Sequence, residues 1–364
     1  MTFKERISKT RVLKQIFVII LDVFFSIVRV VSRVKVKQND RIMIISLHRL
    51  GDTVFTIPSI KAFLKSHSSP VIIVCFQYSE AIYRKHLTSV EYLILNSEEF
   101  LYGGRIASRN ARKKITGAKA FAIIDLVGSI VSASLIFNCK CNFIYGISEN
   151  YFRKIYDKFI PLRNSPHQID LYFDAIRAFS PEVKNTFTGV LIKQVNNGMI
   201  LIHPFAGWSA KEWGFNNFIL LYKLLAKKNS VSLIFPYGRL NEDVISELLS
   251  QDIKFIITKS INHLFNSLEN CCLFIANDSG PLQIAAMMGV PTFTIYGPTN
   301  PVFHIPPGKH HKYIRMELDC SPYTTKICIA DGGESCGHRT CMKQLTVEAV
   351  SEEIEKYLMK MNEF

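Results

Sequence analysis

The chain has 364 residues, and 48% of them are hydrophobic, which is enough for about two domains with sizeable cores. Its net charge of +14 favours an anionic partner such as a membrane surface or a phosphorylated ligand. No low-complexity tract, short repeat or zinc-finger pattern is present, so disorder and nucleic-acid binding are not expected.

The first segment, residues 1–38, carries basic residues at both ends of an apolar run over 16–28. That run is shorter than the roughly 20 residues that cross a bilayer. Asp22 lies within the run and no small-residue cleavage site follows, which argues against a signal peptide. On a helix the polar positions form one narrow stripe: Gln15, Asp22, Ser26, Arg29 and Arg33. Such a basic amphipathic helix either lies in a membrane interface beside anionic lipid or packs on the protein body.

From residue 41 onward, short apolar runs alternate with helical stretches. Strands are predicted at 41–47, 71–76, 121–126 and 143–145, with a helix at 57–64. After a polar break at 194–198, further strands are predicted at 199–203, 231–235, 255–257, 272–276 and 291–296, with a helix at 216–226. Runs without clean alternation are typical of parallel sheets covered on both faces.

This alternation predicts an α/β protein made of two Rossmann-like, doubly wound domains that face a cleft. We place the first domain at 39–192, the second at 193–345 and a final helix at 346–364. Ligands of such domains bind at the carboxyl ends of the strands.

The first motif, Leu50-Gly51-Asp52-Thr53, lies between the first strand and a helix. Gly51 permits a tight turn and the close approach of a substrate. Asp52 then falls near the helix N-terminus, where it is either a helix cap or a catalytic carboxylate. The further glycines of a dinucleotide fingerprint are missing, so a nicotinamide site is not expected.

Two more motifs belong to the second half. Lys211 and Trp213 follow its first strand, where a lysine can neutralise a phosphate or simply be solvated. Asp278, Ser279 and Gly280 follow a later strand and open a helix. A helix N-terminus binds a diphosphate well through its free N–H groups and its dipole, although an ordinary capped helix has the same pattern.

Together these motifs, with the Gly-Val-Pro and Gly-Pro-Thr segments over 289–299 and Cys341-Met342, resemble glycosyltransferase family 9, the bacterial heptosyltransferases. The resemblance covers about residues 40–358. It implies the GT-B fold and an inverting, metal-independent transfer without a cofactor, commonly from ADP-heptose to the lipopolysaccharide inner core. The acceptor would bind to the first half and the nucleotide sugar to the second.

The same resemblance implies individual roles. Asp52 would be the base that deprotonates the acceptor, and Lys211 would stabilise the departing diphosphate. The expected donor-binding residues are Asp278, Ser279, Gly280, Gln283, Glu242 and Thr299. The expected acceptor-binding residues are Gly51, Thr53, Gly128 and Ser129. Many relatives have histidine at the position of Gln283, which leaves open which sugar is transferred.

Four cysteines cluster near the C-terminus: Cys320, Cys328, Cys336 and Cys341. They contain no C-x-x-C pair of the kind that zinc sites usually show. Some protein-modifying members of the family hold iron through cysteines in this region, so these four are candidates for a metal, and thiols or disulfides are the alternative.

We therefore expect a cytoplasmic glycosyltransferase, peripheral at the inner face of the bacterial inner membrane, acting on a lipid-linked glycan. One alternative is a relative that glycosylates a protein or an O-antigen intermediate with another nucleotide sugar. The other is an inactive nucleotide-sugar-binding protein, against which the presence of Asp52, Lys211 and Asp278 argues.

Overall fold

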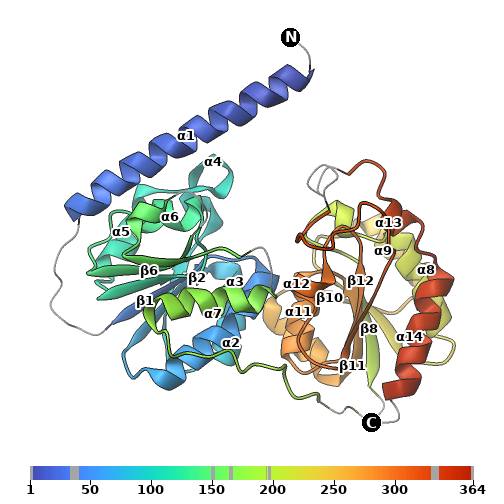
Figure 1. Ribbon diagram of the computed structural model, residues 1–364. Coiled ribbons are helices and arrows are strands. Elements are labelled where there is room, and N and C mark those ends of the chain that lie inside the picture. The colour runs from blue at the N-terminus through green and yellow to red at the C-terminus, as the bar shows by residue number, and fades with distance from the viewer. Residues whose placement is uncertain are drawn as a thin grey trace. The chain divides into compact units, whose positions relative to one another are not determined.

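The computed structural model describes residues 3–32, 41–148, 152–163, 167–193, 195, 198–328 and 336–361, with side chains from residue 15 onward. The chain forms two compact units (Figure 1). One comprises Met1–Arg49, Phe55–Arg163 and Ile169–Asn185. The other comprises Leu50–Val54, Asn164–Gln168 and Thr186–Phe364.

The first unit is built on a six-stranded parallel sheet. Its strands lie in the order β3 (Glu91–Leu95), β2 (Val71–Phe76), β1 (Ile42–Ser46), β5 (Ala122–Asp125), β6 (Phe143–Ser148) and β7 (Lys158–Pro161). The chain starts in the middle of the sheet, moves to one edge and then returns to build the other side. This is the Rossmann-like order, and its direction reverses between β1 and β5.

The second unit repeats this order. Its parallel strands are β10 (Phe255–Thr258), β9 (Val231–Pro236), β8 (Met199–His203), β11 (Cys271–Asn277), β12 (Thr292–Tyr296) and β13 (His311–Arg315). The direction reverses between β8 and β11. Two doubly wound parallel sheets, as expected from the alternating runs, are therefore confirmed.

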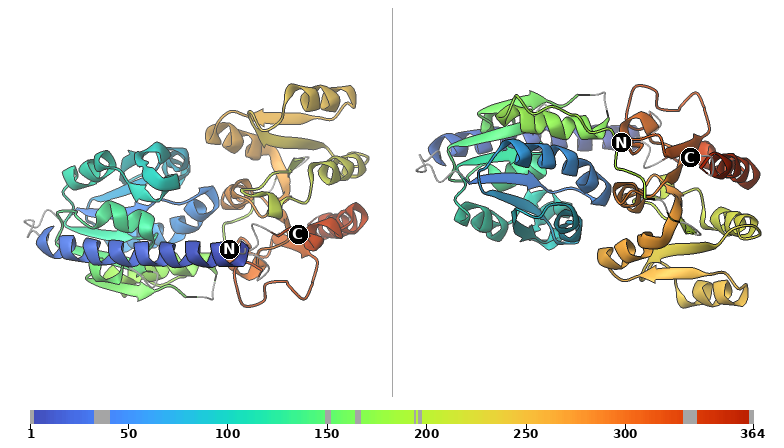
Figure 2. Two further views of the ribbon diagram at one scale, coloured as in Figure 1. Left: turned by 90° about the horizontal axis from the view of Figure 1, so that it is seen from above. Right: turned by 90° about the horizontal axis from the view of Figure 1, so that it is seen from below.

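Helices connect the strands and cover both sheets, as Figures 1 and 2 show. The helices that begin in the first half are α1 (Phe3–Ser32), α2 (Leu50–Ser66), α3 (Gln77–His86), α4 (Leu101–Gly104), α5 (Arg109–Gly117), α6 (Ile130–Ile136) and α7 (Gln168–Phe179), and a short strand, β4 (Ile106–Ala107), precedes α5. Those of the second half are α8 (Phe215–Leu225), α9 (Glu242–Ser250), α10 (Ile261–Ser267), α11 (Gly280–Met287), α12 (Pro301–His304), α13 (Thr340–Lys343) and α14 (Val347–Met361).

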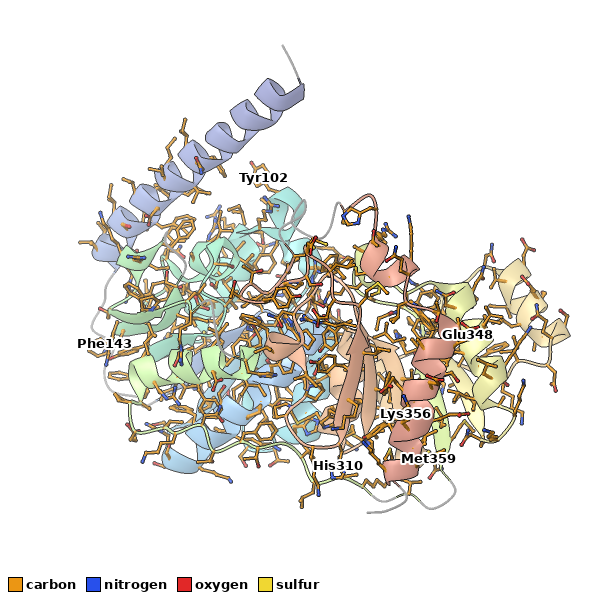
Figure 3. All side chains as sticks on the ribbon, turned by 45° about the vertical axis from the view of Figure 1, so that its right-hand side comes forward. Tyr102, Phe143, His310, Glu348, Lys356 and Met359 are labelled. Atoms are coloured by element: carbon orange, nitrogen blue, oxygen red, sulfur yellow. The ribbon has the colours of Figure 1, made fainter. Side chains whose placement is uncertain are left out.

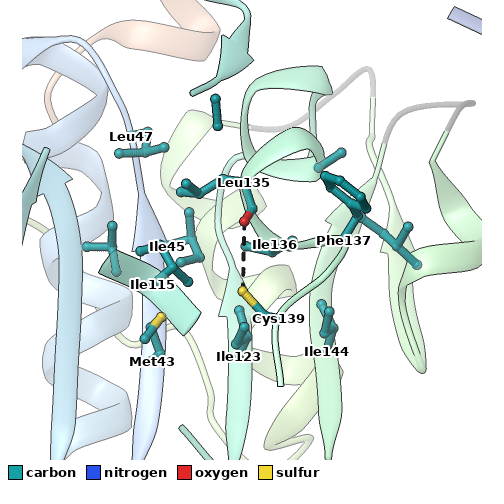
Figure 4. Close-up of a cluster of buried hydrophobic side chains, with 14 of the residues drawn as sticks. Met43, Ile45, Leu47, Ile115, Ile123, Leu135, Ile136, Phe137, Cys139 and Ile144 are labelled. Atoms are coloured by element: carbon teal, nitrogen blue, oxygen red, sulfur yellow. Dashed lines mark hydrogen bonds between the residues drawn. The ribbon is translucent and has the colours of Figure 1, made fainter. Parts of the chain in front are cut away.

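One core of the first unit lies between one face of its sheet and the helices α5 and α6. Met43, Ile45 and Ile123 extend from the strands toward Leu135 and Ile136 in α6 (Figure 4). Because both faces of the central strands are buried, β1 consists of apolar residues followed by one serine. This explains why its sequence shows no alternation of apolar and polar residues.

Helix α1 turns its polar stripe toward the first unit. Arg29 donates hydrogen bonds to the backbone oxygens of Cys139 and Cys141 at 3.2 Å and 3.5 Å, and Asp22 accepts one from the backbone N–H of Phe152 at 3.0 Å. Ser26 is buried as well. Gln15, the first member of the expected stripe, is exposed, and Arg33 lies outside the described residues. The stripe is thus part of the docking face of α1, together with the buried Phe25, and most of the apolar residues of the helix point outward.

By length and composition α1 is able to cross a membrane, because Gln15–Ser32 has a mean hydropathy of 2.1 and is 11% buried. The apolar run alone predicts a shorter segment. The difference arises because the helix extends to Ser32 and continues unbroken through Asp22 and Ser26.

The core of the second unit includes Trp213, whose indole N–H donates to the backbone oxygen of Leu345 at 2.7 Å. Helix α14 closes this core with Val350 and Ile354, while Glu348, Lys356 and Met359 lie on its exposed side (Figure 3). Trp213 is therefore an ordinary core residue.

Candidate active site

The second unit brings two of the expected residues into direct contact beside its central strands. Lys211 lies in a 3-10 turn, Ser209–Lys211, after β8, and Asp278 directly follows β11. The Lys211 ammonium donates to Asp278 Oδ2 at 2.6 Å, and both side chains are largely buried. The two residues come from the strands between which the sheet order reverses, which is where such sheets bind ligands.

Thr299, from the Gly-Pro-Thr loop, completes this group. Its hydroxyl donates to the same Asp278 Oδ2 at 2.8 Å. Burial by itself would raise the pKa of Asp278, but Lys211, His304 and the two hydrogen bonds outweigh burial and hold that pKa below its usual value. The site therefore contains an ionised carboxylate that holds a lysine and a threonine in place.

Helix α11 begins next to this group. Ser279 is its N-cap and Gly280 its first residue, but the Ser279 hydroxyl makes no cap hydrogen bond. Within the described part of the chain, Ser279 Oγ is a buried atom without a hydrogen-bond partner. The opening N–H groups of a helix also lack partners inside the helix. An anion with several acceptor oxygens would satisfy both kinds of donor.

Gln283 is buried on α11, and its side chain is hydrogen-bonded to the backbone of α12. Its amide donates to the backbone oxygen of His304 at 2.8 Å. Burial lowers the pKa of His304, against the opposite effect of Asp278. His304 Nδ1 is a second buried polar atom that lacks a partner among the described residues. The sequence pattern does not indicate this histidine, because it stands in a four-residue helix outside every motif.

Tyr296, at the end of β12, is a further polar residue of this region that its motif does not single out. Its hydroxyl is buried without a described partner. Burial and the nearby charge of Asp278 raise its pKa well above the usual value. Because Tyr296 ends an apolar strand, the sequence suggests a core residue rather than a site residue.

Glu242 is not brought into this group. It is the exposed first residue of α9, after the N-cap Asn241, and no hydrogen bond or ion pair found in the described part of the chain joins it to Asp278. Instead, Arg239 pairs with Glu212 at 2.7 Å, and its guanidinium lies 4.7 Å from the centre of the Phe205 ring. Phe205 and Glu212 follow β8, in the same segment as Lys211, and Arg239 follows β9.

Asp52 lies in the first turn of α2 and is half-buried. The N-cap of that helix is Arg49, and no side chain makes a cap hydrogen bond there. The interpretation of Asp52 as the helix cap is therefore wrong, because the helix begins at Leu50, three residues earlier than a cap at Asp52 would require. Its other interpretation, a carboxylate that acts on substrate, stays a prediction.

Gly128 and Ser129 follow β5, beside the reversal point of the first sheet. Gly128 has a φ of +65°, and a Cβ built there would lie 2.6 Å from the backbone oxygen of Ile147. The Ser129 hydroxyl accepts a hydrogen bond from the Val131 N–H at 3.3 Å and caps α6. Both residues thus have structural roles, and Thr53 is buried. Their expected contacts with the acceptor stay predictions.

The four C-terminal cysteines line one small pocket together with His338 and Arg339. Burial raises the pKa of the Cys341 thiol to about 11. No group of three or more histidine, cysteine or acidic side chains is positioned to hold a metal ion within the described ranges, which leave out residues 329–335.

Solved structures share this fold. The E. coli heptosyltransferase WaaC with ADP-2-deoxy-2-fluoro heptose aligns with a TM-score of 0.65 and 16% identity, covering 87% of this chain and 99% of that one. A glycosyl transferase family 9 protein from Veillonella parvula aligns with a TM-score of 0.68 and 18% identity, covering 90% and 99%. With its two doubly wound sheets, the protein has the GT-B fold.

Sequence comparison then defines the family. The model of glycosyltransferase family 9 (heptosyltransferase) matches residues 109–332, more than half of the chain. A lipooligosaccharide heptosyltransferase 2 from Campylobacter jejuni is 26% identical over 321 residues, which are 84% of this chain and 96% of that protein. The chain belongs to glycosyltransferase family 9.

Proposed function

We propose that this glycosyltransferase moves heptose from ADP-heptose to the lipopolysaccharide core or a related lipid-linked glycan. The observation that carries the proposal is the Lys211–Asp278–Thr299 group beside the first turn of α11. The names of the similar proteins support it, since they include lipooligosaccharide heptosyltransferase 2 and a heptosyltransferase bound to an ADP-heptose analogue.

The donor diphosphate would bind between Lys211 and the N-terminus of α11. A lysine ammonium has three donors, of which Asp278 takes one, so two remain for phosphate oxygens. Ser279 Oγ and the free N–H groups of α11 add uncharged donors. These groups are in position before the reaction, and their interaction with the leaving diphosphate strengthens as negative charge develops on it. This gives the site a way to stabilise the leaving group that needs no metal.

Asp52 would act on the acceptor. Its carboxylate takes the proton of the acceptor hydroxyl while the hydroxyl oxygen forms a bond to the anomeric carbon of the sugar. The bond from that carbon to the diphosphate breaks, and ADP leaves with the electron pair. Attack opposite the leaving group inverts the anomeric centre. Gly51, Thr53, Gly128 and Ser129 are the residues that we expect to position the acceptor.

The protein would work in the cytoplasm at the inner face of the inner membrane. Helix α1 supports this, because most of its described apolar side chains are exposed, although Phe25 packs on the unit that carries the helix. A lipid-linked acceptor lies in the same membrane, so association with the surface raises the frequency of encounters.

A second candidate function is the transfer of a different sugar. Gln283 occupies a position where many relatives have histidine, and its side chain is fixed to the backbone of His304. A different polar group beside the sugar favours a different nucleotide sugar, with an O-antigen intermediate or a protein as acceptor. An inactive binding protein is the remaining alternative.

The test is a panel of ADP-heptose, ADP-glucose, UDP-glucose and GDP-mannose, each assayed with extracted core lipid, with an O-antigen lipid intermediate and with protein acceptors. Rapid transfer from ADP-heptose to core lipid alone supports the proposal. Preference for another donor or acceptor selects the second candidate. Binding of a donor without transfer to any acceptor would mean an inactive protein.

A further inference from the structure

The first unit has a basic pocket that the proposed chemistry does not use. Its volume is about 670 Å³, and it lies along α5 and the turn after α6. Five basic side chains line it: Arg109, Arg112, Lys113, Lys119 and Lys140. The other lining residues are uncharged, and no acidic side chain is among them.

Among the described residues, no ion pair is found for Arg109, Lys113 or Lys140 of this pocket. Burial and the like charge of Arg109 lower the pKa of Arg112. The nearest acidic pairing on α5 is made by Lys114, which binds Glu99 at 2.8 Å and does not line the pocket. A concentration of cations without a carboxylate favours an anionic ligand.

The pocket is joined to α1 by one aromatic side chain. The Arg112 guanidinium lies 5.7 Å from the centre of the Phe137 ring. On α1, the ring of Phe25 stacks on Phe137 at 4.3 Å and the ring of Phe24 lies 5.9 Å from it. Phe24 is itself 52% exposed. The basic pocket and α1 therefore lie next to each other, because Arg29 of α1 also bonds to Cys139 and Cys141, the neighbours of the pocket residue Lys140.

The outer side of α1 is apolar. Nine of its side chains are 48–80% exposed: Ile16, Phe17, Ile19, Ile20, Val23, Phe24, Ile27, Val30 and Val31. An ordinary surface helix has the reverse arrangement, with polar residues outside. A contiguous apolar face of this extent marks an interaction site in a soluble protein.

We propose that the basic pocket and the outer face of α1 form one docking site for an anionic lipid bilayer. The apolar face enters the boundary of the acyl chains, while Arg109, Lys113 and Lys140 bind the phosphates of acidic headgroups. This deepens the membrane association in the proposed function and names the residues that select the lipid. An apolar protein partner would satisfy α1 but would leave the adjacent cations without counter-charges, so the combined surface favours a bilayer.

The attachment of α1 sets its orientation. Arg29 is buried, bonded to Cys139 and Cys141 and paired with Asp157 at 3.4 Å. A helix that crossed the bilayer would have to release these bonds and place the Arg29 charge among acyl chains. With the bonds retained, α1 lies in the plane of the membrane surface.

The experiment measures sedimentation of the full-length protein with vesicles, without donor or acceptor. One vesicle type is phosphatidylcholine, and the other contains 40% phosphatidylglycerol. The pocket variant combines R109Q, K113Q and K140Q, all at exposed positions. The matched control removes the same charge elsewhere in the unit with K61Q, K65Q and K184Q, also exposed. The helix variant combines I20Q, I27Q and V30Q.

We expect the wild-type protein to bind the anionic vesicles more tightly than the neutral ones. Each headgroup contact contributes about fivefold, so the pocket variant should lose about 100-fold in affinity for anionic vesicles and little for neutral ones. The control should lose much less. The helix variant should lose affinity for both vesicle types. Thermal unfolding of each variant confirms that it is folded.

Equal binding of the pocket variant and the wild-type protein to anionic vesicles would overturn the proposal. A control variant that binds anionic vesicles as weakly as the pocket variant would also overturn it. So would a wild-type protein that alkaline carbonate fails to extract from membranes, since that result means a spanning helix. Vesicle binding does not depend on the identity of the sugar or on Asp52. Failure of this proposal is therefore distinct from failure of the proposed transfer, which the donor panel measures.

Discussion

The two units share one strand order but use their polar residues differently at the reversal point. In the first unit, buried Asp125 ends β5 and accepts hydrogen bonds from the Tyr156 hydroxyl at 2.6 Å and the Val127 N–H at 2.9 Å. Burial raises the pKa of Asp125, and these hydrogen bonds, which lower it, only partly offset that effect. In the second unit, Asp278 follows the equivalent strand, β11, and has the Lys211 cation as a partner, so that its pKa is lowered.

The neighbouring serines differ in the same way. Ser129 caps α6 with its hydroxyl, whereas the hydroxyl of Ser279, the N-cap of α11, makes no cap bond. The first unit satisfies its polar groups internally at this point, and the second keeps a charge pair and unpaired donors. The same fold thus supplies a capped turn in one unit and, in the other, the group of residues that we propose as the diphosphate site.

The largest effect should come from Asp52→Asn. If Asp52 is the base, the rate of transfer should fall about 10³-fold, because general-base catalysis contributes about 10²–10⁴-fold. Binding of ADP, measured by calorimetry, should not change. Asp243→Asn, which removes a carboxylate from the first turn of α9, is the matched control. Near-normal transfer by the Asp52 variant would remove this residue from the mechanism.

Lys211→Met tests the charge pair. We expect transfer to fall at least 10²-fold, since a preorganised donor to the leaving group is lost. Unfolding in urea should show a destabilisation of about 3 kcal/mol, because the Asp278 carboxylate stays buried without its cation. The double variant with Asp278→Asn should recover stability but not activity. Recovery of both would mean that the pair is only structural.

The second unit should lose stability as the pH becomes mildly acidic. Burial lowers the pKa of His203 and of His311 to about 4. Above pH 6.5 both states of the protein hold these rings neutral, so the full stability is present. As the pH falls from 6.5 to about 4, the unfolded chain binds protons first, and each ring costs up to about 3 kcal/mol of unfolding free energy.

His203→Gln should flatten this dependence, and urea titrations at pH 7 and pH 4.5 measure the change. An unchanged slope of stability against pH would mean that His203 is protonated in the folded protein.

The smallest effects should separate the two serines. Ser129→Ala removes a cap and should cost about 1 kcal/mol of stability. Ser279→Ala removes no hydrogen bond of the protein and should leave stability unchanged, but transfer should fall about tenfold because a donor to the phosphate is lost. Transfer kinetics and urea unfolding of both variants show which serine contributes to stability and which to transfer. The comparison of the two units fails if Ser279→Ala lowers stability and leaves transfer intact.

The strands at the centre of each sheet were predictable, because both faces of these strands are buried and their sequences are continuously apolar. The edge strands β3, β7 and β13 were not predicted. Each carries charged or polar residues, such as Glu91, Lys158 and Lys312, because part of its surface meets solvent. Burial, rather than intrinsic strand preference, made the other strands visible.

The residues of the candidate site were likewise only partly predictable from the sequence. Lys211, Asp278 and Ser279 stand in motifs at strand ends, so their neighbourhood follows from the topology of the sheet. His304 and Tyr296 reach the site through tertiary packing, which no local pattern encodes. The polar stripe of α1 was visible as a helical period, but only the partners of Arg29 show that it faces inward.

The attachment of α1 also sets an order of events during synthesis. Arg29 bonds to residues 110 to 128 positions further along the chain. At the usual speed of translation these partners emerge on the order of ten seconds after Arg29. During that interval the apolar side chains of α1 are in contact with whatever surrounds the ribosome. A nascent helix that met the bilayer at this stage would reach the membrane before the domain that holds it had folded.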